Sequence, residues 1–562
     1  MYHMKKTIVS VCLLALYGFS QAQTSTTNQP WVADKGDGTY QNPILHADYS
    51  DPDAIRVGND YYLVASSFNF APGLPILHSK DLVNWTIIGH ALNKQPPFER
   101  FQHVQPGGGV WAPAIRFHNN EFYIYYPDPD EGIYVVKAKN PAGPWSAPIM
   151  VKKAKGWIDP CPFWDEDGKA YLANGMAGSR SGIKSCLIMS RMNTEGTALL
   201  DDGAIVFDGH DKHPTIEGPK IYKRNGYYYL LAPAGGVGKG WQLALRSKNI
   251  YGPYEEKIVL EQGKTPINGP HQGGLVTTPL GESWFLHFQD KDAYGRILHL
   301  QPVKWVNDWP LMGEDKDGNG IGEPVLTYSK PKVATSVAKA APATSDEFND
   351  SQLGLQWQFG ANRQSNFCFP AGKAYGFLRL FNLPIADTAK NLWLVPNIVS
   401  QKFPAPNFTA TAKLTFTPRT NDEEVGLMVT GIDYSYLSVK QTANGLIIGQ
   451  TICIDAEHGQ AEQKLPTVAL NTTTFYLKVT VQNVLPTDSD YKLMNKAENS
   501  DYGNARCLFS YSTNGTDFKP IGIAFGAKKG KWVGSTLGLF AIRKGKTYET
   551  GYADVDWFRV SQ

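Results

Sequence analysis

The sequence predicts an all-β protein in which a five-bladed β-propeller is followed by a C-terminal β-sandwich. Three observations carry this prediction. A turn followed by an aromatic-rich strand recurs five times between residues 59 and 289. Beyond residue 345, apolar and polar residues alternate along several segments. The 562 residues include 54 Gly and 37 Pro. The combined share of these two residues exceeds the roughly 12% of average usage, which favours many short strands joined by turns.

The five repeats each place an Asn, Asp or Gly turn before a strand. They read NDYYLVASS from Asn59, NNEFYIYYP from Asn119, DGKAYLANG from Asp167, NGYYYLLAP from Asn225 and GESWFLHFQ from Gly281. Three are followed by a second shared piece, which reads HSKDLVNW, KAKNPAGPW or RSKNIYGPY. Units of this length match propeller blades, and isolated hairpins would not be stable. Residues 36–325 are therefore expected to form five blades around a central channel.

The regularity stops near residue 325. Residues 326–345 read LTYSKPKVATSVAKAAPATS, which is rich in Ala, Ser, Thr, Pro and Lys and predicts a linker. Residues 346–562 contain segments such as FTATAKLTFTP and FYLKVTVQNV, whose period of two predicts the strands of a β-sandwich.

The N-terminus predicts an export signal. Lys5 and Lys6 precede the apolar run IVSVCLLALYGF, and the small residues of Ser20-Gln21-Ala22 follow it, so residues 1–22 are expected to be a signal peptide. The run is too short to span a membrane. We expect an exported protein, periplasmic or secreted, without a membrane anchor.

Charge and cysteine content exclude several classes. The net charge of +2 gives no electrostatic reason to expect nucleic acid as a partner. We expect the protein to be a monomer. Five cysteines lie beyond the signal peptide without CxxC spacing, which makes a zinc site improbable and favours buried structural thiols.

Three acids occupy equivalent positions in three repeats. Asp51, Asp159 and Glu217 each stand before Pro or Gly-Pro, eight residues before the turn of their repeat. The innermost strand of each blade lines the channel, so equivalent positions in different blades point at the same axis. Although most acids of a chain are solvated turn residues, this register favours a cluster of carboxylates in the channel.

Such a cluster suits glycosidic hydrolysis. Like-charge repulsion and burial raise the pKa of at least one of three neighbouring carboxyls, so one can be protonated while another is ionised. The protonated carboxyl serves as general acid and the ionised one activates water or attacks the sugar. The sequence holds no phosphate-binding loop that would favour another chemistry.

Several segments together resemble glycoside hydrolase family 43. They are NPILHADYSDPDAIRVGNDYYLVASS, GGGVWAPAIRF, GWIDPCPFWDEDGKAYL, IEGPKIYKRNGYYYLL and NGPHQG, in that order. The resemblance covers nearly all of the chain beyond the signal peptide. It implies an inverting mechanism with Asp51 as general base, Glu217 as general acid and Asp159 as the carboxylate that tunes the acid. Asp53 stands where many members have Ser, and we expect Asp48 and Asp53 to be turn caps or solvated.

The same resemblance implies further site residues. Arg296 resembles an arginine that contacts the sugar near the catalytic acids. Trp111 could stack on a sugar face or pack in the core, and Phe68 and Phe70 fall at positions of pocket-wall aromatics. His271 resembles a channel histidine that in many members ligates a calcium ion or holds its waters, so one calcium ion is a possible cofactor. A hydrogen-bonded core histidine is the alternative.

The function expected from this resemblance is removal of a terminal pentose from an oligosaccharide. We favour an α-L-arabinofuranosidase acting on plant cell-wall glycans such as xyloglucan or arabinoxylan, because Asn69 and Ala71 depart from the usual β-xylosidase wall. A β-D-xylosidase acting on xylo-oligosaccharides is the alternative. A non-catalytic sugar-binding propeller and a retaining, sucrose-cleaving hydrolase are the alternatives from other classes, and the carboxylate separation distinguishes retaining from inverting enzymes.

Overall fold

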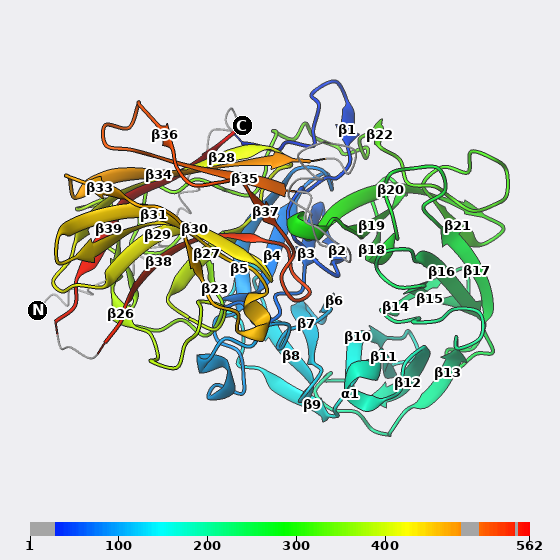
Figure 1. Cartoon of the computed structure of the whole chain (residues 1–562). Coiled ribbons are helices and arrows are strands. Elements are labelled where there is room, and N and C mark those ends of the chain that lie inside the picture. The colour runs from blue at the N-terminus through cyan, green and yellow to red at the C-terminus, as the bar shows by residue number, and fades with distance from the viewer. Residues whose placement is uncertain (1–28, 485–504, 546–548) are drawn as a thin grey trace, which may run out of the picture.

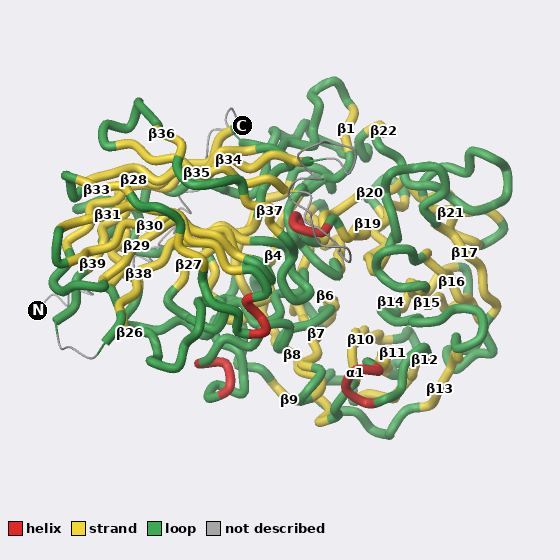
Figure 2. Tube along the Cα trace, viewed as in Figure 1, coloured by secondary structure: helices red, strands yellow, loops and turns green. Residues whose placement is uncertain are grey.

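The computed structural model describes residues 29–484, 505–545 and 549–562. The expected signal peptide lies outside these residues. Strands dominate the described chain, and helix is confined there to α1 (Gly178–Ser181) and to 3-10 turns at Arg100–Gln102, Asp292–Tyr294 and Ala456–His458 (Figure 2). No helix among the described residues has the length and apolar character that crossing a membrane requires.

The first half of the chain is a five-bladed propeller, which confirms the predicted fold (Figure 1). Each blade is a sheet of four consecutive antiparallel strands. The blades are β2 (Asp53–Val57), β3 (Asp60–Val64), β4 (Gly73–Ser79) and β5 (Trp85–Leu92); β6 (Ala114–His118), β7 (Glu121–Asp128), β8 (Gly132–Ala138) and β9 (Ile149–Lys153); β10 (Trp157–Trp164), β11 (Ala170–Met176), β12 (Cys186–Met192) and β13 (Ala204–Asp208); β14 (Lys220–Arg224), β15 (Tyr227–Ala234), β16 (Trp241–Ser247) and β17 (Glu255–Leu260); and β18 (His271–Thr277), β19 (Ser283–Asp290), β20 (Arg296–Val306) and β21 (Trp309–Met312).

The repeated sequence motif is the second strand of each blade. The five copies correspond to β3, β7, β11, β15 and β19. Their alternate residues enter different interfaces: Leu230 of β15 packs toward blade three, whereas Leu231 packs toward blade five. Five hydrophobic clusters thus fill the five spaces between neighbouring blades. Because both faces of each blade are buried, the strand motif is apolar and aromatic on both faces.

The ring is closed by contacts between its first and last blades. Leu45, which precedes β2, exchanges backbone hydrogen bonds with Leu298 of β20. Arg56 of β2 donates from Nε to the carbonyl of Thr277 of β18 at 2.7 Å.

The segment between the two domains is pinned to the propeller. β22 (Thr327–Ser329) pairs with β1 (Thr39–Gln41). Lys330 then forms ion pairs with Asp34 at 2.5 Å and Asp81 at 2.9 Å.

The second domain is a β-sandwich of two large sheets, which also confirms the prediction. One sheet has the order β23-β27-β38-β29-β30-β31-β32, with β26 beside β38 and β33 beside β31; the other has the order β24-β25-β39-β28-β34-β35-β36, with β37 beside β35. The strands of the nine-stranded sheet are β23 (Gln358–Phe359), β26 (Leu383–Pro384), β27 (Ile398–Lys402), β29 (Glu423–Thr430), β30 (Tyr434–Thr442), β31 (Gly445–Cys453), β32 (Gln463–Lys464), β33 (Val468–Leu470) and β38 (Thr536–Arg543). Those of the eight-stranded sheet are β24 (Cys368–Pro370), β25 (Leu378–Phe381), β28 (Phe408–Thr417), β34 (Thr474–Asn483), β35 (Ala505–Ser512), β36 (Lys519–Pro520), β37 (Phe525–Ala527) and β39 (Tyr552–Ser561).

The nine-stranded sheet is buried on both faces. Leu437 and Val439 of β30 face the main core between the sheets, whereas Tyr434 and Tyr436 face a second cluster on the outer side. Leu392 and Val395, from the loop between β26 and β27, cover that outer cluster. The five cysteines of the described chain are free and buried, as expected.

Candidate active site

The three predicted carboxylates sit at the entrances of inner strands. Asp51 precedes β2, Asp159 is the third residue of β10, and Glu217 precedes β14. These strands come from blades one, three and four, and each is the first strand of its blade. The charge of Asp51 lies close enough to raise the pKa of both Asp159 and Glu217. The structure therefore brings all three to one point of the channel.

A distortion of the backbone aims two of these side chains. Asp51 and Asp159 adopt left-handed conformations, with φ of 52° and 56°. In blade four the left-handed residue is Gly218, with φ of 59°, and the carboxylate comes from the residue before it. Such conformations cost of order 1–3 kcal/mol in residues other than Gly and gather at functional sites.

Asp51 is buried and accepts hydrogen bonds from three neighbouring side chains. It is 4% exposed. Its Oδ2 accepts hydrogen bonds from the hydroxyls of Ser50 at 2.7 Å and Ser66 at 2.6 Å. Arg296 at the start of β20, itself 8% exposed, donates to its Oδ1 at 3.0 Å. Arg296 is thus a buried partner of Asp51, and the alternative of a surface arginine on a strand is excluded.

Asp159 and Glu217 carry raised pKa values. Burial is the main cause at both, and the negative charge of Asp51 raises both further. The charge of Asp159 also raises the pKa of Glu217. Asp159 accepts a hydrogen bond from the backbone N–H of Gly218 at 2.7 Å, which ties it to the chain beside Glu217. A carboxyl with a raised pKa next to an ionised one can hold the proton that acid catalysis needs.

His271, the first residue of β18, is fully buried beside Glu217. Its Nε2 lies 3.5 Å from Oε1 of Glu217. Burial, followed by the nearby charge of Arg296, lowers the pKa of His271 to about 3, so its ring is neutral at physiological pH. Within the described chain neither ring nitrogen has a hydrogen-bond partner among the protein groups.

Asp48 and Asp53 are not solvated, and that expectation was wrong. Asp48 accepts the backbone N–H of Arg296 and that of Gly534 in the sandwich domain, both at 2.9 Å. Asp53 is fully buried and binds Arg116 of blade two at 2.6 Å. Both acids make contacts across blades or domains, which their local sequence does not reveal.

The predicted aromatic residues occupy different surroundings. Phe68 is 3% exposed, and its ring packs edge-on against Trp111 at 6.4 Å. Trp111 is partly exposed, and its Nε1 donates to the carbonyl of Gly107 at 2.9 Å. Phe70 lies with Ser66 and Lys402 around a small cavity at the junction with the sandwich.

An aromatic residue of the sandwich completes this group. Trp532, in the loop between β37 and β38, packs edge-on against Trp111 at a centroid distance of 6.0 Å. The guanidinium carbon of Arg296 lies 5.7 Å from the same indole. Trp532 is 47% exposed, so much of it faces solvent beside the catalytic acids. The sandwich therefore forms part of the active-site wall.

Sequence reasoning missed two further channel residues. Lys220 on β14 is fully buried, and its charge opposes the rise in the pKa of Asp159. Gln272, next to His271, lies within reach of Asp159. Lys220 stands three residues after Glu217 in EGPK, at the start of an inner strand, so its position offered a signal. Trp532 offered none, since it lies in another domain.

Charged side chains do not gather around His271 in a pattern typical of a calcium site within the described chain. Calcium takes six to eight oxygen ligands. No three His, Cys, Asp or Glu side chains of the described chain come together as a metal site. Because calcium prefers oxygen ligands, His271 would hold such an ion through water molecules bound to its ring nitrogens.

A propeller channel that holds a protonated carboxyl next to an ionised one has what cleavage of a glycosidic bond requires, so fold and site define a glycoside hydrolase. The chain belongs to glycosyl hydrolase family 43, whose model matches residues 40–310. A beta xylosidase C-terminal concanavalin A-like domain matches residues 345–561.

Relatives extend over nearly the whole chain. A putative beta-xylosidase of Xylanibacter ruminicola is 41% identical, over 90% of this chain and 86% of that protein. The non-reducing end alpha-L-arabinofuranosidase BoGH43B of Bacteroides ovatus is 30% identical, over 97% of both chains. The GH43 protein BlXynB of Bacillus licheniformis, solved as a K247S mutant, is similar in structure with a TM-score of 0.77 and 26% identity, over 93% of this chain and 99% of that one.

Proposed function

We propose that the protein is an inverting exo-glycosidase that removes a terminal β-D-xylose from xylo-oligosaccharides. The observation that carries the chemistry is the pair formed by Asp51, held by Arg296 and two hydroxyls, and Glu217, whose pKa is raised. The relative that is 41% identical over 90% of the chain bears a β-xylosidase name, which supports the choice of sugar.

The proposed reaction uses the two carboxyls on opposite faces of the sugar. Asp51, as general base, takes a proton from a water molecule while that water attacks the anomeric carbon. Glu217, as general acid, gives its proton to the leaving oxygen as the glycosidic bond breaks. Asp159 keeps the pKa of Glu217 high through its charge and fixes the neighbouring backbone. Neutral His271 packs beside Glu217 without adding a positive charge.

Release of α-L-arabinofuranose is the second candidate, favoured by the 30% identical relative that bears that name. The sequence argument for an arabinofuranosidase was that Asn69 and Ala71 depart from the usual β-xylosidase wall, and the contacts of these two residues do not support that argument. Asn69 donates to the carbonyl of Gly360 in the sandwich at 2.7 Å, and Ala71 exchanges backbone hydrogen bonds with Phe359. Both residues therefore face the domain junction and cannot report which pentose the site accepts.

The test compares 4-nitrophenyl β-D-xyloside, 4-nitrophenyl α-L-arabinofuranoside and xylobiose. We expect a higher kcat/KM for the β-xyloside than for the arabinofuranoside. Proton NMR during xylobiose cleavage should show that the xylose released from the non-reducing end forms first as the α anomer. A higher kcat/KM for the arabinofuranoside would show that the enzyme prefers arabinofuranose to xylose. β-Xylose as the first product would refute inversion.

Three further expectations remain proposals. A calcium ion held through water by His271 would show as a fall in Tm upon EDTA treatment that calcium reverses. Export with cleavage after Ala22 would show as a new N-terminus at Gln23 by mass spectrometry. A monomer would show by light scattering at a mass close to that of one chain.

A further inference from the structure

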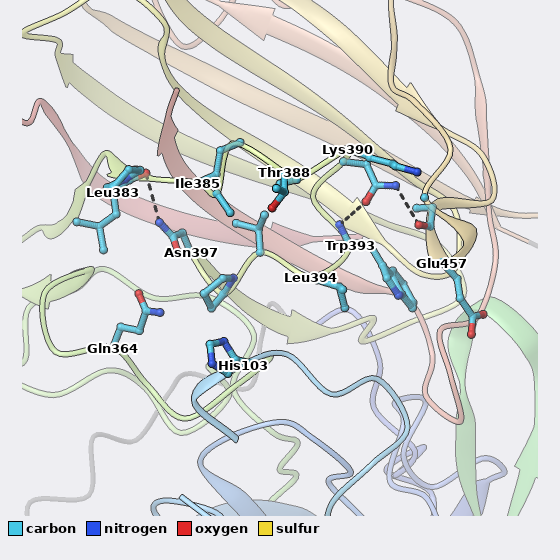
Figure 3. Close-up of a pocket in the computed structure, with 18 of the residues that line it drawn as sticks. His103, Gln364, Leu383, Ile385, Thr388, Lys390, Trp393, Leu394, Asn397 and Glu457 are labelled. Atoms are coloured by element: carbon cyan, nitrogen blue, oxygen red, sulfur yellow. Dashed lines mark hydrogen bonds between the residues drawn. The ribbon is translucent and has the colours of Figure 1, made fainter. Parts of the chain in front are cut away.

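A cavity of about 710 Å³ opens in the sandwich, close to its junction with the propeller (Figure 3). Its walls are the loop between β26 and β27, the turn at Ala456–His458, and residues 364–366. His103 from the propeller forms the opposite wall. The volume lies in the range of ligand pockets, roughly 300–1,000 Å³.

The lining combines an aromatic surface with unused polar groups. Trp393 is partly exposed and lines the cavity, next to Leu394, which is 59% exposed. Within the described residues the side chains of Gln364, Asn366 and Thr388 make no hydrogen bond. These amides and the hydroxyl can both donate and accept toward a ligand.

Two of the charged groups at the edge are paired, whereas Lys390 lines the cavity without an ion-pair partner among the described residues. Glu457 forms an ion pair with Lys531. His458 binds Asp455 at 2.5 Å. A ligand with many hydroxyl groups and apolar C–H faces suits this lining, because hydroxyls pair with amides and with the ammonium of Lys390, and C–H faces stack on an indole.

One loop separates this cavity from the catalytic acids. Lys531, the partner of Glu457, directly precedes Trp532, which packs on Trp111 in the active-site wall. On the propeller side, Gly107 approaches both Lys531 and Trp532, and it follows His103 by four residues. The same loop therefore contacts both the edge of the cavity and the active-site wall.

We propose that the cavity is a second saccharide-binding site, which holds internal sugar units of a xylan chain away from the bond that is cleaved. The ligand class rests on the proposed xylosidase function, whereas the presence of a site rests on the cavity and its lining. Trp393 provides the stacking surface, and Gln364 and Asn366 bind hydroxyls.

The test measures binding to a polymer. An exo-acting site takes only chain ends, which are scarce in a polymer, so slowed migration in a native gel containing soluble arabinoxylan reports binding of internal units. The full chain is used with Asp51→Asn to prevent cleavage. Trp393→Ala and the double variant Gln364→Ala/Asn366→Ala are compared with Tyr375→Ala, which removes a 74% exposed aromatic outside the cavity.

We expect both cavity variants to raise the apparent Kd for arabinoxylan about fivefold, the order expected for loss of one aromatic contact, and Tyr375→Ala to leave it unchanged. When the same cavity variants are made in the active chain that keeps Asp51, the ratio of kcat/KM for xylohexaose to that for xylobiose should fall by a similar factor. The double variant removes no internal hydrogen bond and guards against misfolding of Trp393→Ala. Unchanged Kd values in both cavity variants would overturn the proposal.

The proposed function can fail separately. If the wild-type chain cleaves no pentoside but the cavity variants still lose arabinoxylan binding, the second site stands and the xylosidase assignment falls. If xylosides are cleaved and the variants bind as the parent does, the opposite holds.

Discussion

Replacing Asp159 with Asn tests whether this carboxylate tunes the acid. The substitution removes one negative charge and keeps the side-chain oxygen that accepts from Gly218. Both Oδ2 of Asp159 and Cβ of Glu217 lie 3.5 Å from the point where a Cβ on Gly175 would stand, so these two atoms are within 7 Å of each other.

This distance sets the size of the effect. Two unit charges ~7 Å apart interact by about 2.4 kcal/mol at an effective dielectric constant of 20. At 1.36 kcal/mol per unit, that equals about 1.7 pKa units, and somewhat less when the carboxyl of Glu217 points away. Asp159 raises the pKa of Glu217, so Asp159→Asn must lower it. The basic limb of the pH–rate profile, where the acid loses its proton, is therefore expected to move down by ~1–1.5 pH units.

The assay is kcat/KM against pH for xylobiose, whose leaving group needs protonation. Asp167→Asn is the matched control, because Asp167 precedes the next strand of the same blade and its side chain is 45% exposed. We expect the control to keep the wild-type limb. A limb that stays in place or moves upward in Asp159→Asn would refute the tuning role, and an equal shift in Asp167→Asn would point to a general charge effect.

Four further changes have defined outcomes. Asp51→Asn should lower kcat by ~10²–10⁴-fold with an unchanged circular dichroism spectrum, and an unchanged kcat would remove Asp51 as base. Glu217→Gln should lose most activity on xylobiose but keep part of it on a dinitrophenyl xyloside, whose leaving group departs without a proton; equal losses on both would show that Glu217 is not the acid. Asp53→Asn should destabilise the fold by ~3–5 kcal/mol in urea unfolding, because it leaves Arg116 buried without its carboxylate, and a loss below 1 kcal/mol would contradict this. Trp532→Ala should raise KM for xylobiose more than it lowers kcat, and an unchanged KM would exclude it from substrate contact.

The propeller and its catalytic acids were predictable from the sequence because both follow a repeat. Each of the five motif copies is the second strand of its blade. The fixed spacing before the motif turn places Asp51, Asp159 and Glu217 at the starts of inner strands. Burial on both blade faces keeps that motif apolar, so it remains recognisable. The pattern of alternation likewise reveals the sandwich.

The contacts between blades and domains could not be predicted in this way. Asp48 binds a backbone N–H of Gly534, 486 residues further along, and no local pattern marks such a pair. Asn69 and Ala71 lie between β3 and β4, yet they hydrogen-bond to Gly360 and Phe359 of the sandwich. The cavity beside Trp393 is formed by four separate segments, each of which has the sequence of an ordinary loop.

The position of β39 in its sheet affects when the sandwich can complete its fold during synthesis. β39 ends at Ser561, yet it lies in the interior of its sheet, between β25 and β28. A ribosome makes β39 after every other described strand of this sheet, so the sheet lacks a central member until β39 has emerged. The loop that carries Trp532 is fixed to Asp48 from this late-forming domain. The propeller can form its blades earlier, but its catalytic wall is assembled only after β39 is made. Deletion of β39 should therefore damage an active site whose acids lie several hundred residues before it.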